Sequence, residues 1–255
     1  MTSSEKSSDK IKEITSDKIF NDSTFIDQHK DGYRFNSDSM ILSWFIFKML
    51  SEKDVPTSIE AGSGTGVVPI VLSCHGFKSK TYCFEVQDNL FNLLRQNIEK
   101  NGLSDTLTPI KDSFLNMSLP FTKKCDLVYT NPPYFPVNAG KHSPNNEKAK
   151  AKHEFFGSLN DFLLSASKIL KDKGHFIFVY PTSRIQFALS SVTKAGFSLR
   201  HLYLYRENPS VSPSLFTAHL VLSNCETVSK TKLITMRDSA GEYTSVGQEI
   251  MYDKA

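Results

Sequence analysis

The fold is decided by residues 58–67, which read SIEAGSGTGV. An apolar start typical of a short buried strand precedes three alternate glycines, Gly62, Gly64 and Gly66, and residues 67–74 then predict a helix. Glycine tolerates positive φ angles and lets a ligand come close to the backbone, so such a turn in an α/β protein is suited to nucleotide binding. The turn lacks the lysine of a phosphate-binding P-loop, which argues against ATP hydrolysis. Its glycine spacing differs from that of NAD-binding turns, which argues against NAD as the ligand.

Short apolar runs and amphipathic stretches alternate on both sides of this turn. Strands are expected at 58–61, 81–86, 107–110, 126–130, 175–180, 201–205 and 215–222, and helices at 38–50, 67–74, 89–101, 159–170 and 185–195. The alternation predicts an α/β fold with a doubly wound, mostly parallel sheet. Only the loop 206–214 separates the last two strands, so we expect that pair to be antiparallel.

Acidic residues occur at the ends of the first three expected strands. Glu60 ends the first strand, where its carboxylate can face an ammonium group. Glu85 ends the second strand, where a carboxylate can accept hydrogen bonds from both hydroxyls of a ribose. Asp112 and Ser113 follow the third strand, where the amino group of an adenine can be recognised. Together with the glycines, these positions predict S-adenosylmethionine as the bound cofactor.

The most specific signal is DLVYTNPPY at residues 126–134. Two prolines fix φ and remove two backbone donors, so the Pro132 carbonyl and the Asn131 side-chain oxygen can point at one place. Two converging acceptors suit a planar amino group, and Tyr134 offers a flat face on which a base can stack. We therefore expect Asn131, Pro132, Pro133 and Tyr134 to form a catalytic amine pocket, with Asn131 also beside the cofactor.

These motifs resemble those of the class I S-adenosylmethionine-dependent N-methyltransferases. Two further stretches, DGYRFNSDSMIL at 31–42 and the segment 138–154 after the Asn-Pro-Pro-Tyr motif, resemble the bacterial tRNA(Val) adenine-37 N6-methyltransferases. The resemblance covers about residues 25–222. It implies a Rossmann-like fold with seven strands in the order 3-2-1-4-5-7-6 and helices on both faces, and an enzyme that methylates adenine N6 in a tRNA anticodon loop.

The resemblance also implies which residues bind the cofactor. Arg34 and Asp38 would lie at the pocket rim, over the methionine end of the methyl donor. The full expected set is Arg34, Asp38, Glu60, Gly62, Gly64, Gly66, Glu85, Val86, Asp112, Ser113 and Asn131. Two positions depart from the family pattern: Lys152 replaces the usual arginine before His153, and the loop 206–214 is less basic than is usual.

The net charge of the chain is only +3, from 30 Lys and Arg against 27 Asp and Glu, which excludes a polybasic protein. The whole excess lies within residues 138–153, beside the amine pocket. We interpret this loop as the tRNA contact, through Lys141, His142, Lys148, Lys150, Lys152 and His153. His153 and Glu154 have no third metal ligand nearby in sequence, so no metal is expected.

The cysteine count and the lengths of the apolar runs exclude further classes of protein. Four cysteines, none in CxxC spacing, argue against a zinc ribbon or a disulfide framework. The longest apolar run, 40–50, is too short to span a bilayer, and residues 1–18 lack the apolar core of a signal peptide. We expect a monomer in the cytoplasm with a disordered tail at 1–18, a methyltransferase domain at 19–225 whose lead-in (19–56) is helical, and an extension at 226–255 made of a strand, a turn and a helix.

Three alternatives stay open. A guanine-N2 methyltransferase of rRNA shares the amine-pocket motif. A release-factor glutamine-N5 methyltransferase also shares it, although that family usually carries a sizeable helical domain before the glycine turn, and here only about 57 residues precede the turn. A non-catalytic RNA-binding scaffold is the third alternative, against which the intact glycines and the intact Asn-Pro-Pro-Tyr argue.

Overall fold

The glycine turn follows a strand in the middle of the sheet. The computed structural model describes residues 13–19, 24–30, 36–117, 124–134, 157–223 and 230–252. Its strands are β1 (Ile14–Ile19), β2 (Thr24–His29), β3 (Thr57–Ala61), β4 (Lys80–Phe84), β5 (Leu107–Ile110), β6 (Cys125–Thr130), β7 (Leu170–Pro181), β8 (Phe197–Arg206), β9 (Leu215–Leu222) and β10 (Lys230–Thr235). Its α-helices are α1 (Ser37–Leu50), α2 (Val67–Cys74), α3 (Asp88–Lys100), α5 (Leu159–Ile169), α6 (Ile185–Lys194) and α7 (Ser245–Tyr252), and Phe114–Asn116 and Thr182–Arg184 form the short 3₁₀ helices η1 and η3.

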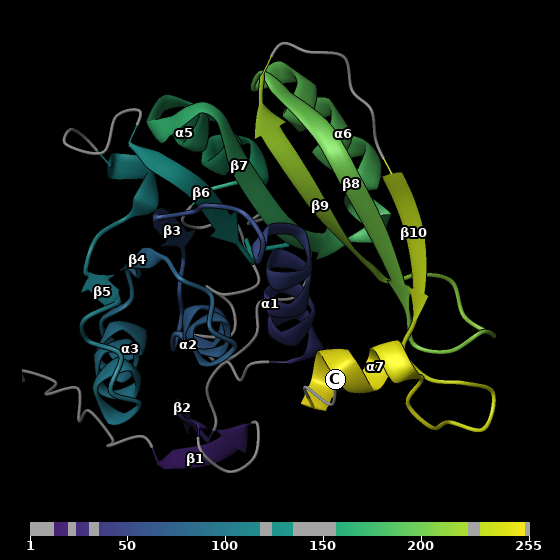
Figure 1. Ribbon diagram of the computed structural model, residues 1–255, viewed down its shortest axis with the longest axis horizontal. Helices are drawn as coiled ribbons and strands as arrows, with labels where there is room; N and C mark the ends of the chain where they lie inside the picture. Colours follow the sequence, from purple (N-terminus) through teal and green to yellow (C-terminus); the bar gives the residue numbers. More distant parts are fainter. Residues whose placement is uncertain are drawn as a thin grey trace, which may run out of the picture.

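Among the described residues, eight strands form one sheet in the order β10-β8-β9-β7-β6-β3-β4-β5 (Figure 1). Counted from β3, the first seven strands have the order 3-2-1-4-5-7-6, and β9 runs antiparallel to both β7 and β8, as expected for the last pair. The expected number of seven strands is wrong, because β10 pairs in parallel with β8 and covers what would otherwise be an open edge.

Helices cover both faces of the sheet, as the alternation predicts. On one face α1, α2 and α3 pack against side chains such as Tyr129 and Ile177, and on the other face α5 and α6 pack against Val128 and Phe176. The strands β6 and β7 bury side chains on both faces, which is the condition for a parallel sheet in the centre of a domain. Within the described residues, no helix is both long enough and apolar enough to cross a membrane.

A separate hairpin, β1–β2, lies beside α3. Its strand β1 includes residues 14–18, so the expected disordered tail is wrong for these residues, while residues 1–12 lie outside the described ones. The lead-in 19–56 is likewise not purely helical, because β2 precedes α1. Two asparagines of α3 explain the docking. Asn97 and Asn101 each accept a hydrogen bond from a backbone N–H of β2 and donate one to the carbonyl of the same residue. Their side-chain amides thus make the pair of hydrogen bonds that a residue of a neighbouring strand would make with β2.

The C-terminal residues pack on the same core as the sheet. Met236 and Ile250 are buried together with side chains of α1, and Lys48 of α1 lies 3.7 Å from Glu249 of α7.

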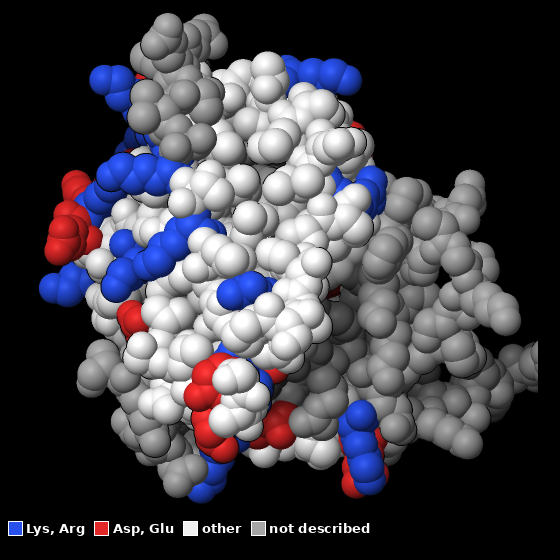
Figure 2. Space-filling model, turned by 90° about the vertical axis from the view of Figure 1, so that its right-hand side faces the viewer, with Lys and Arg blue, Asp and Glu red and all other residues white. Residues whose placement is uncertain are grey.

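The face that shows the β10 edge carries most of its Lys and Arg side chains in its upper left part (Figure 2). Lys230 and Lys232 of β10 are both exposed, and lysines on an edge strand discourage pairing with another chain.

Three histidines form a hydrogen-bonded row across β7, β9 and β8. His219 Nε2 lies 3.0 Å from His175 Nδ1, and His219 Nδ1 lies 3.1 Å from His201 Nδ1. Burial is the main cause that lowers the pKa of His175 to about 4 and that of His219 to about 2. Each contact needs one N–H and one bare nitrogen, so the row is satisfied by neutral rings. Among the described residues, no group of three or more His, Cys, Asp or Glu side chains is arranged to hold a metal ion.

This row predicts a loss of stability in acid. In the unfolded chain these histidines take up protons near their usual pKa of about 6.5, whereas the folded chain keeps His175 and His219 neutral to lower pH. The contribution of the row to the free energy of unfolding is therefore fully present above pH 6.5. It decreases as the pH falls toward 4, by about 1.4 kcal/mol per pH unit for each proton that only the unfolded chain binds. Urea unfolding between pH 7.5 and 4.5 measures the slope. His219→Gln should make it shallower, and an unchanged slope would contradict the prediction.

Candidate active site

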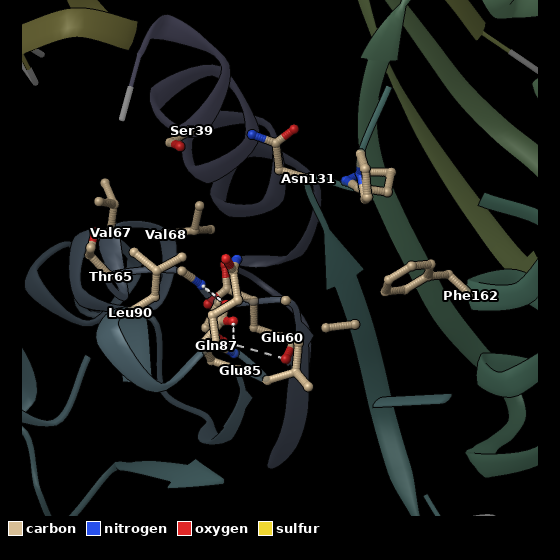
Figure 3. A pocket seen from close by; sticks show the side chains of 17 residues that line it. Ser39, Glu60, Thr65, Val67, Val68, Glu85, Gln87, Leu90, Asn131 and Phe162 are labelled. Carbon is tan, nitrogen blue, oxygen red and sulfur yellow. Dashed lines mark hydrogen bonds between the residues drawn. The ribbon is translucent and has the colours of Figure 1, made fainter. Parts of the chain in front are cut away.

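A pocket opens at the carboxyl ends of β3, β4 and β6, where the glycine turn and the Asn-Pro-Pro-Tyr motif meet (Figure 3). It lies next to β3, the point at which the strand order reverses and where α/β folds bind ligands. Its lining combines backbone of the turn, two carboxylates and apolar side chains. The lining residues are Ser39, Glu60, Ala61, Gly62, Ser63, Gly64, Thr65, Val67, Val68, Glu85, Val86, Gln87, Leu90, Asn131, Pro132, Pro133 and Phe162.

The three glycines of the turn adopt the left-handed conformation that their sequence predicts. Their φ angles are +79° at Gly62, +56° at Gly64 and +86° at Gly66. At Gly62 and Gly64 an added Cβ would meet no atom within 4 Å, so this backbone is open to a ligand. At Gly66 an added Cβ would lie 2.7 Å from the Leu94 side chain, so this glycine lets α2 start close to α3.

Glu85 holds the glycine turn from the end of β4. Its Oε2 accepts from the backbone N–H of Gly64 at 2.9 Å, and its Oε1 accepts from that of Gln87 at 2.7 Å. Burial raises the pKa of the Glu85 carboxyl, and the hydrogen bonds from the backbone N–H groups of Gln87 and Gly64 counteract that rise. A carboxylate has about four acceptor positions, so Glu85 keeps acceptor capacity for two further hydroxyl hydrogens.

Glu60 is the second buried carboxylate of the pocket. Only 3% of the residue is exposed, and its Oε2 has no hydrogen-bond partner among the described residues. Burial raises the pKa of Glu60 well above its usual range, and the neighbouring Glu85 raises it further. A cationic group in the pocket would pair with this oxygen and favour the charged form.

S-adenosylmethionine fits these residues. Glu85 would hold the ribose hydroxyls, Glu60 would face the ammonium group, and the open backbone at Gly62 and Gly64 leaves room for close approach. The apolar side chain of Leu90 lies on the same side of the pocket as Glu85, and together with Val86 of the lining it provides surface for a purine ring.

The Asn-Pro-Pro-Tyr motif begins directly after β6, with Asn131 across the pocket from Glu85 (Figure 3). The Tyr134 hydroxyl lies 2.7 Å from Asn131 Oδ1 and 2.7 Å from Asp38 Oδ2 of α1. Arg184 of η3 donates from Nη1 to the Tyr134 carbonyl at 2.5 Å, and its guanidinium lies over the rings of Tyr180 and Phe187. The motif is therefore held from α1 on one side and from the end of β7 on the other.

Most of the expected site residues that the structure describes come together here, and several do not. The pocket lining includes Glu60, Gly62, Gly64, Glu85, Val86, Asn131, Pro132 and Pro133. Gly66, Asp112 and Ser113 are not part of the lining, and the exposed Asp112 accepts from the N–H of Ser113 at 2.6 Å. Asp38 contacts Tyr134 next to the pocket. Arg34 and the six expected RNA contacts at 141–153 lie outside the described residues.

Several residues of the site were not expected from the sequence, among them four that come from α1, α3, α5 and η3. Ser39, Leu90 and Phe162 line the pocket from α1, α3 and α5, and Arg184 supports Tyr134. Arg184 follows the apolar strand at 175–180, so the rule that strand ends carry functional groups could have indicated it. No sequence signal separates Phe162 from the other buried side chains of its helix.

Asn97 connects the hairpin to the glycine turn. Besides its two bonds to Asp27, its Nδ2 donates to the Thr65 carbonyl at 2.9 Å, and the residue is fully buried. Asn101 makes the corresponding pair of bonds to Phe25 but does not contact the glycine turn. The two asparagines thus form a matched pair that differs in one contact with the site.

We expect Asn97→Ala to weaken donor binding about tenfold, because the Thr65 carbonyl loses a buried hydrogen bond that fixes the turn. Asn101→Ala should loosen the hairpin to a similar degree and leave donor affinity unchanged. Calorimetry with S-adenosylmethionine, together with thermal unfolding of both variants, measures the difference. Equal donor affinities of the two variants would contradict this role of Asn97.

The fold has many solved relatives. A predicted O-methyltransferase from Agrobacterium tumefaciens superposes with a TM-score of 0.65 over 84% of this chain and 94% of its own, at 12% identity. This is the fold of the class I S-adenosylmethionine-dependent methyltransferases. The predicted Rossmann-like α/β class is thereby confirmed.

Sequence relatives agree with the methyltransferase fold and with the predicted resemblance. Two proteins named tRNA1(Val) (adenine(37)-N6)-methyltransferase, from Porphyromonas gingivalis and Actinobacillus pleuropneumoniae, are 23% identical over 164 residues and 27% identical over 158 residues. The matched regions cover 63% and 62% of this chain and 64% and 63% of those proteins. A release factor glutamine methyltransferase from Clostridium botulinum is 24% identical over 97 residues, or 38% of this chain and 34% of its own. No family model matches the sequence.

Proposed function

We propose that this protein is an S-adenosylmethionine-dependent methyltransferase that methylates an exocyclic amine, namely adenine N6 in the anticodon loop of a tRNA. The observation that carries the proposal is the position of Asn131, Pro132 and Pro133 on the wall of the pocket whose other wall holds Glu60 and Glu85. An amine acceptor site and a donor site thus share one cavity.

The chemistry needs orientation more than proton transfer. S-adenosylmethionine supplies an activated methyl group on a sulfonium. Asn131 Oδ1 and the Pro132 carbonyl would accept the two hydrogens of the amine, which aims the nitrogen lone pair at the methyl carbon. As the N–C bond forms, the bond between the methyl carbon and the donor sulfur would break and leave S-adenosylhomocysteine. Positive charge would pass from the sulfur to the nitrogen, where the same two oxygens stabilise it. One amine hydrogen then leaves as a proton to water, so no strong general base is required.

The choice of a tRNA adenine is supported by the relatives named for that reaction and by the basic segment 138–153. An anticodon-loop base is already partly unstacked, so it enters a pocket at lower cost than a base in a duplex, where a few kcal/mol is typical. The ring of Tyr134 lies next to the pocket and is available for stacking on such a base.

The decisive experiment is nucleoside mass analysis of unmodified bulk tRNA after reaction with labelled S-adenosylmethionine. N6-methyladenosine in one tRNA supports the proposal. N2-methylguanosine in rRNA, or methylglutamine in a release factor incubated in parallel, would replace it with one of the two rival enzymes. Absence of donor binding in calorimetry would point to the non-catalytic RNA-binding scaffold.

The proposed binding of tRNA is tested by changing the lysines of the basic segment 138–153. Changing Lys141, Lys148, Lys150 and Lys152 together to Gln should weaken tRNA binding and flatten its salt dependence, because each lost phosphate contact removes up to about 0.9 from the slope of log K against log salt. Donor affinity should stay the same. The matched control changes four exposed lysines at or before the amino ends of β3, β4 and β6, away from the pocket at their carboxyl ends, namely Lys53, Lys78, Lys80 and Lys124. Equal loss of tRNA affinity in both variants would contradict the assignment.

A further inference from the structure

We propose that Asp38 and Tyr134 orient the side-chain amide of Asn131, so that its oxygen faces the substrate amine. The sequence assigned Asp38 to the rim of the donor site, and the geometry points to a different role. This inference rests on the proposed amine methylation, and its test contains a measurement that does not need turnover.

The three side chains form a continuous row from α1 to the pocket. Asp38 is the second residue of α1, after the N-cap Asn36, and only 6% of it is exposed. Its Oδ2 lies 2.7 Å from the Tyr134 hydroxyl oxygen, which lies 2.7 Å from Asn131 Oδ1. Tyr134 is fixed further by Arg184 at its carbonyl and by the Tyr180 ring, which meets its own ring edge to face at 5.6 Å between centroids.

The number of hydrogens available for hydrogen bonds in this row determines how the Asn131 amide is oriented. The Tyr134 hydroxyl has one hydrogen, whereas the carboxylate of Asp38 and the amide oxygen of Asn131 have none. With the amide oxygen on Tyr134, two acceptors compete for one hydrogen. Turning the amide by 180° exchanges two groups of nearly equal size and gives every atom a partner. In the turned form Asn131 Nδ2 would take the place of Oδ1 and donate to the Tyr134 oxygen, and Tyr134 would donate to Asp38 alone.

The direction of this row determines what the amine meets. The atom of the Asn131 amide that does not face Tyr134 lies on the side of Ser39, which is part of the pocket lining (Figure 3). With Nδ2 on Tyr134, that atom is the oxygen, and it can accept a hydrogen from the substrate amine. With the reverse orientation an NH₂ group would face another NH₂ group, so donors would oppose donors.

Asp38 is therefore a positioning residue that acts through Tyr134. Because an ionised carboxylate can only accept, it draws the Tyr134 hydrogen away from Asn131 and sets one direction for the whole row. Asparagine at this position still offers an oxygen and can keep the direction. Leucine offers none, so the Tyr134 hydrogen would go to Asn131 Oδ1 and the amide would present its hydrogens to the substrate.

The kinetic test compares Asp38→Leu, Asp38→Asn, Tyr134→Phe and the double variant of Asp38→Leu with Tyr134→Phe. We expect kcat to fall about 10- to 100-fold in Asp38→Leu and in Tyr134→Phe, in line with the loss of one preorganised hydrogen bond to the reacting group. Asp38→Asn should recover most of this loss. The double variant should be no slower than the slower single variant, because both changes break the same row. Donor affinity should stay within about threefold in all four, and Lys48→Gln at the exposed end of the same helix serves as the control.

A spectroscopic measurement separates this inference from the proposed reaction. In ¹⁵N-labelled protein, the side-chain NH₂ signal of Asn131 is assigned by its absence in Asn131→Asp. We expect Tyr134→Phe to shift that signal upfield, because Nδ2 loses its acceptor. An unchanged signal would overturn the inference even if adenine methylation is established. Weaker donor binding in both Asp38 variants would also overturn it and return Asp38 to the donor site. Failure of the wild-type protein to methylate any amine, with the expected shift present, would remove the reaction and leave the orientation of the amide intact.

Discussion

Replacing Asn131 by alanine is expected to reduce methyl transfer by about 10²- to 10³-fold while donor affinity stays within about threefold. The side-chain amide is one of the two acceptors proposed to hold the amine, and the other, a backbone carbonyl, cannot aim the nitrogen alone. In the proposed binding mode the donor is held mainly from the opposite wall, by Glu85 and Glu60, so its binding should not depend on Asn131. Single-turnover kinetics with saturating donor measures the chemical step, and calorimetry measures the affinity.

The control for this variant is Asn116→Ala, which removes an exposed asparagine outside the pocket lining and should leave both quantities unchanged. Turnover of Asn131→Ala at close to the wild-type rate would show that the amine pocket is assigned to the wrong residues. A parallel loss of donor affinity would instead place Asn131 chiefly in the donor site.

Replacing Glu85 by alanine is expected to weaken S-adenosylmethionine binding by about 100-fold. Two hydrogen bonds from ribose hydroxyls to a carboxylate would be lost, at about 1.5 kcal/mol or more each. The same change frees the backbone N–H groups of Gly64 and Gln87, so the glycine turn loses its tie to β4. Equilibrium binding of the donor, measured without any acceptor, gives the effect.

Asp88→Ala is the matched control, because it removes a carboxylate three residues away that is exposed and pairs with Lys111 on the surface. Its donor affinity should equal that of the wild type. Glu85→Gln should fall between the two, since the amide keeps one acceptor oxygen but brings hydrogens toward the N–H groups that Glu85 now accepts from. Donor affinity in Glu85→Ala within threefold of the wild type would contradict the ribose assignment.

The parts of the fold that repeat a local pattern were predictable. The alternation of apolar runs and amphipathic stretches gave the class of fold and the antiparallel last pair, because each element buries a face that its own periodicity reveals. The strand and the helix of the C-terminal extension were also expected, but the pairing of that strand with β8 was not, and neither was the hairpin. β1 reads ITSDKI, with few apolar side chains, and its hairpin is held by Asn97 and Asn101, about 70 residues further along the chain.

The site likewise contains residues that the sequence indicated and residues that it did not. Glu60, Glu85 and Asn131 follow strands of a parallel sheet, and since the ends of such strands meet at one edge, their meeting in one pocket could be expected. The direction of the Asp38 side chain could not, because a position in the first turn of a helix does not say which neighbour it will contact. Asp112 was expected by the strand-end rule and yet lies outside the lining, because its carboxylate turns back onto Ser113.

The packing of α7 against α1 places a helix from outside the pocket next to the helix that carries Asp38. α1 carries Asp38 in its first turn, and α7 packs against the same helix through buried side chains such as Ile250. Gly247 leaves no space for a side chain, since an added Cβ would lie 2.1 Å from the Met236 carbonyl oxygen. A side chain at position 247 would therefore have to displace α7, which packs against α1. The close packing that Gly247 permits thus bears on the helix that carries Asp38, although no residue of α7 is part of the pocket lining.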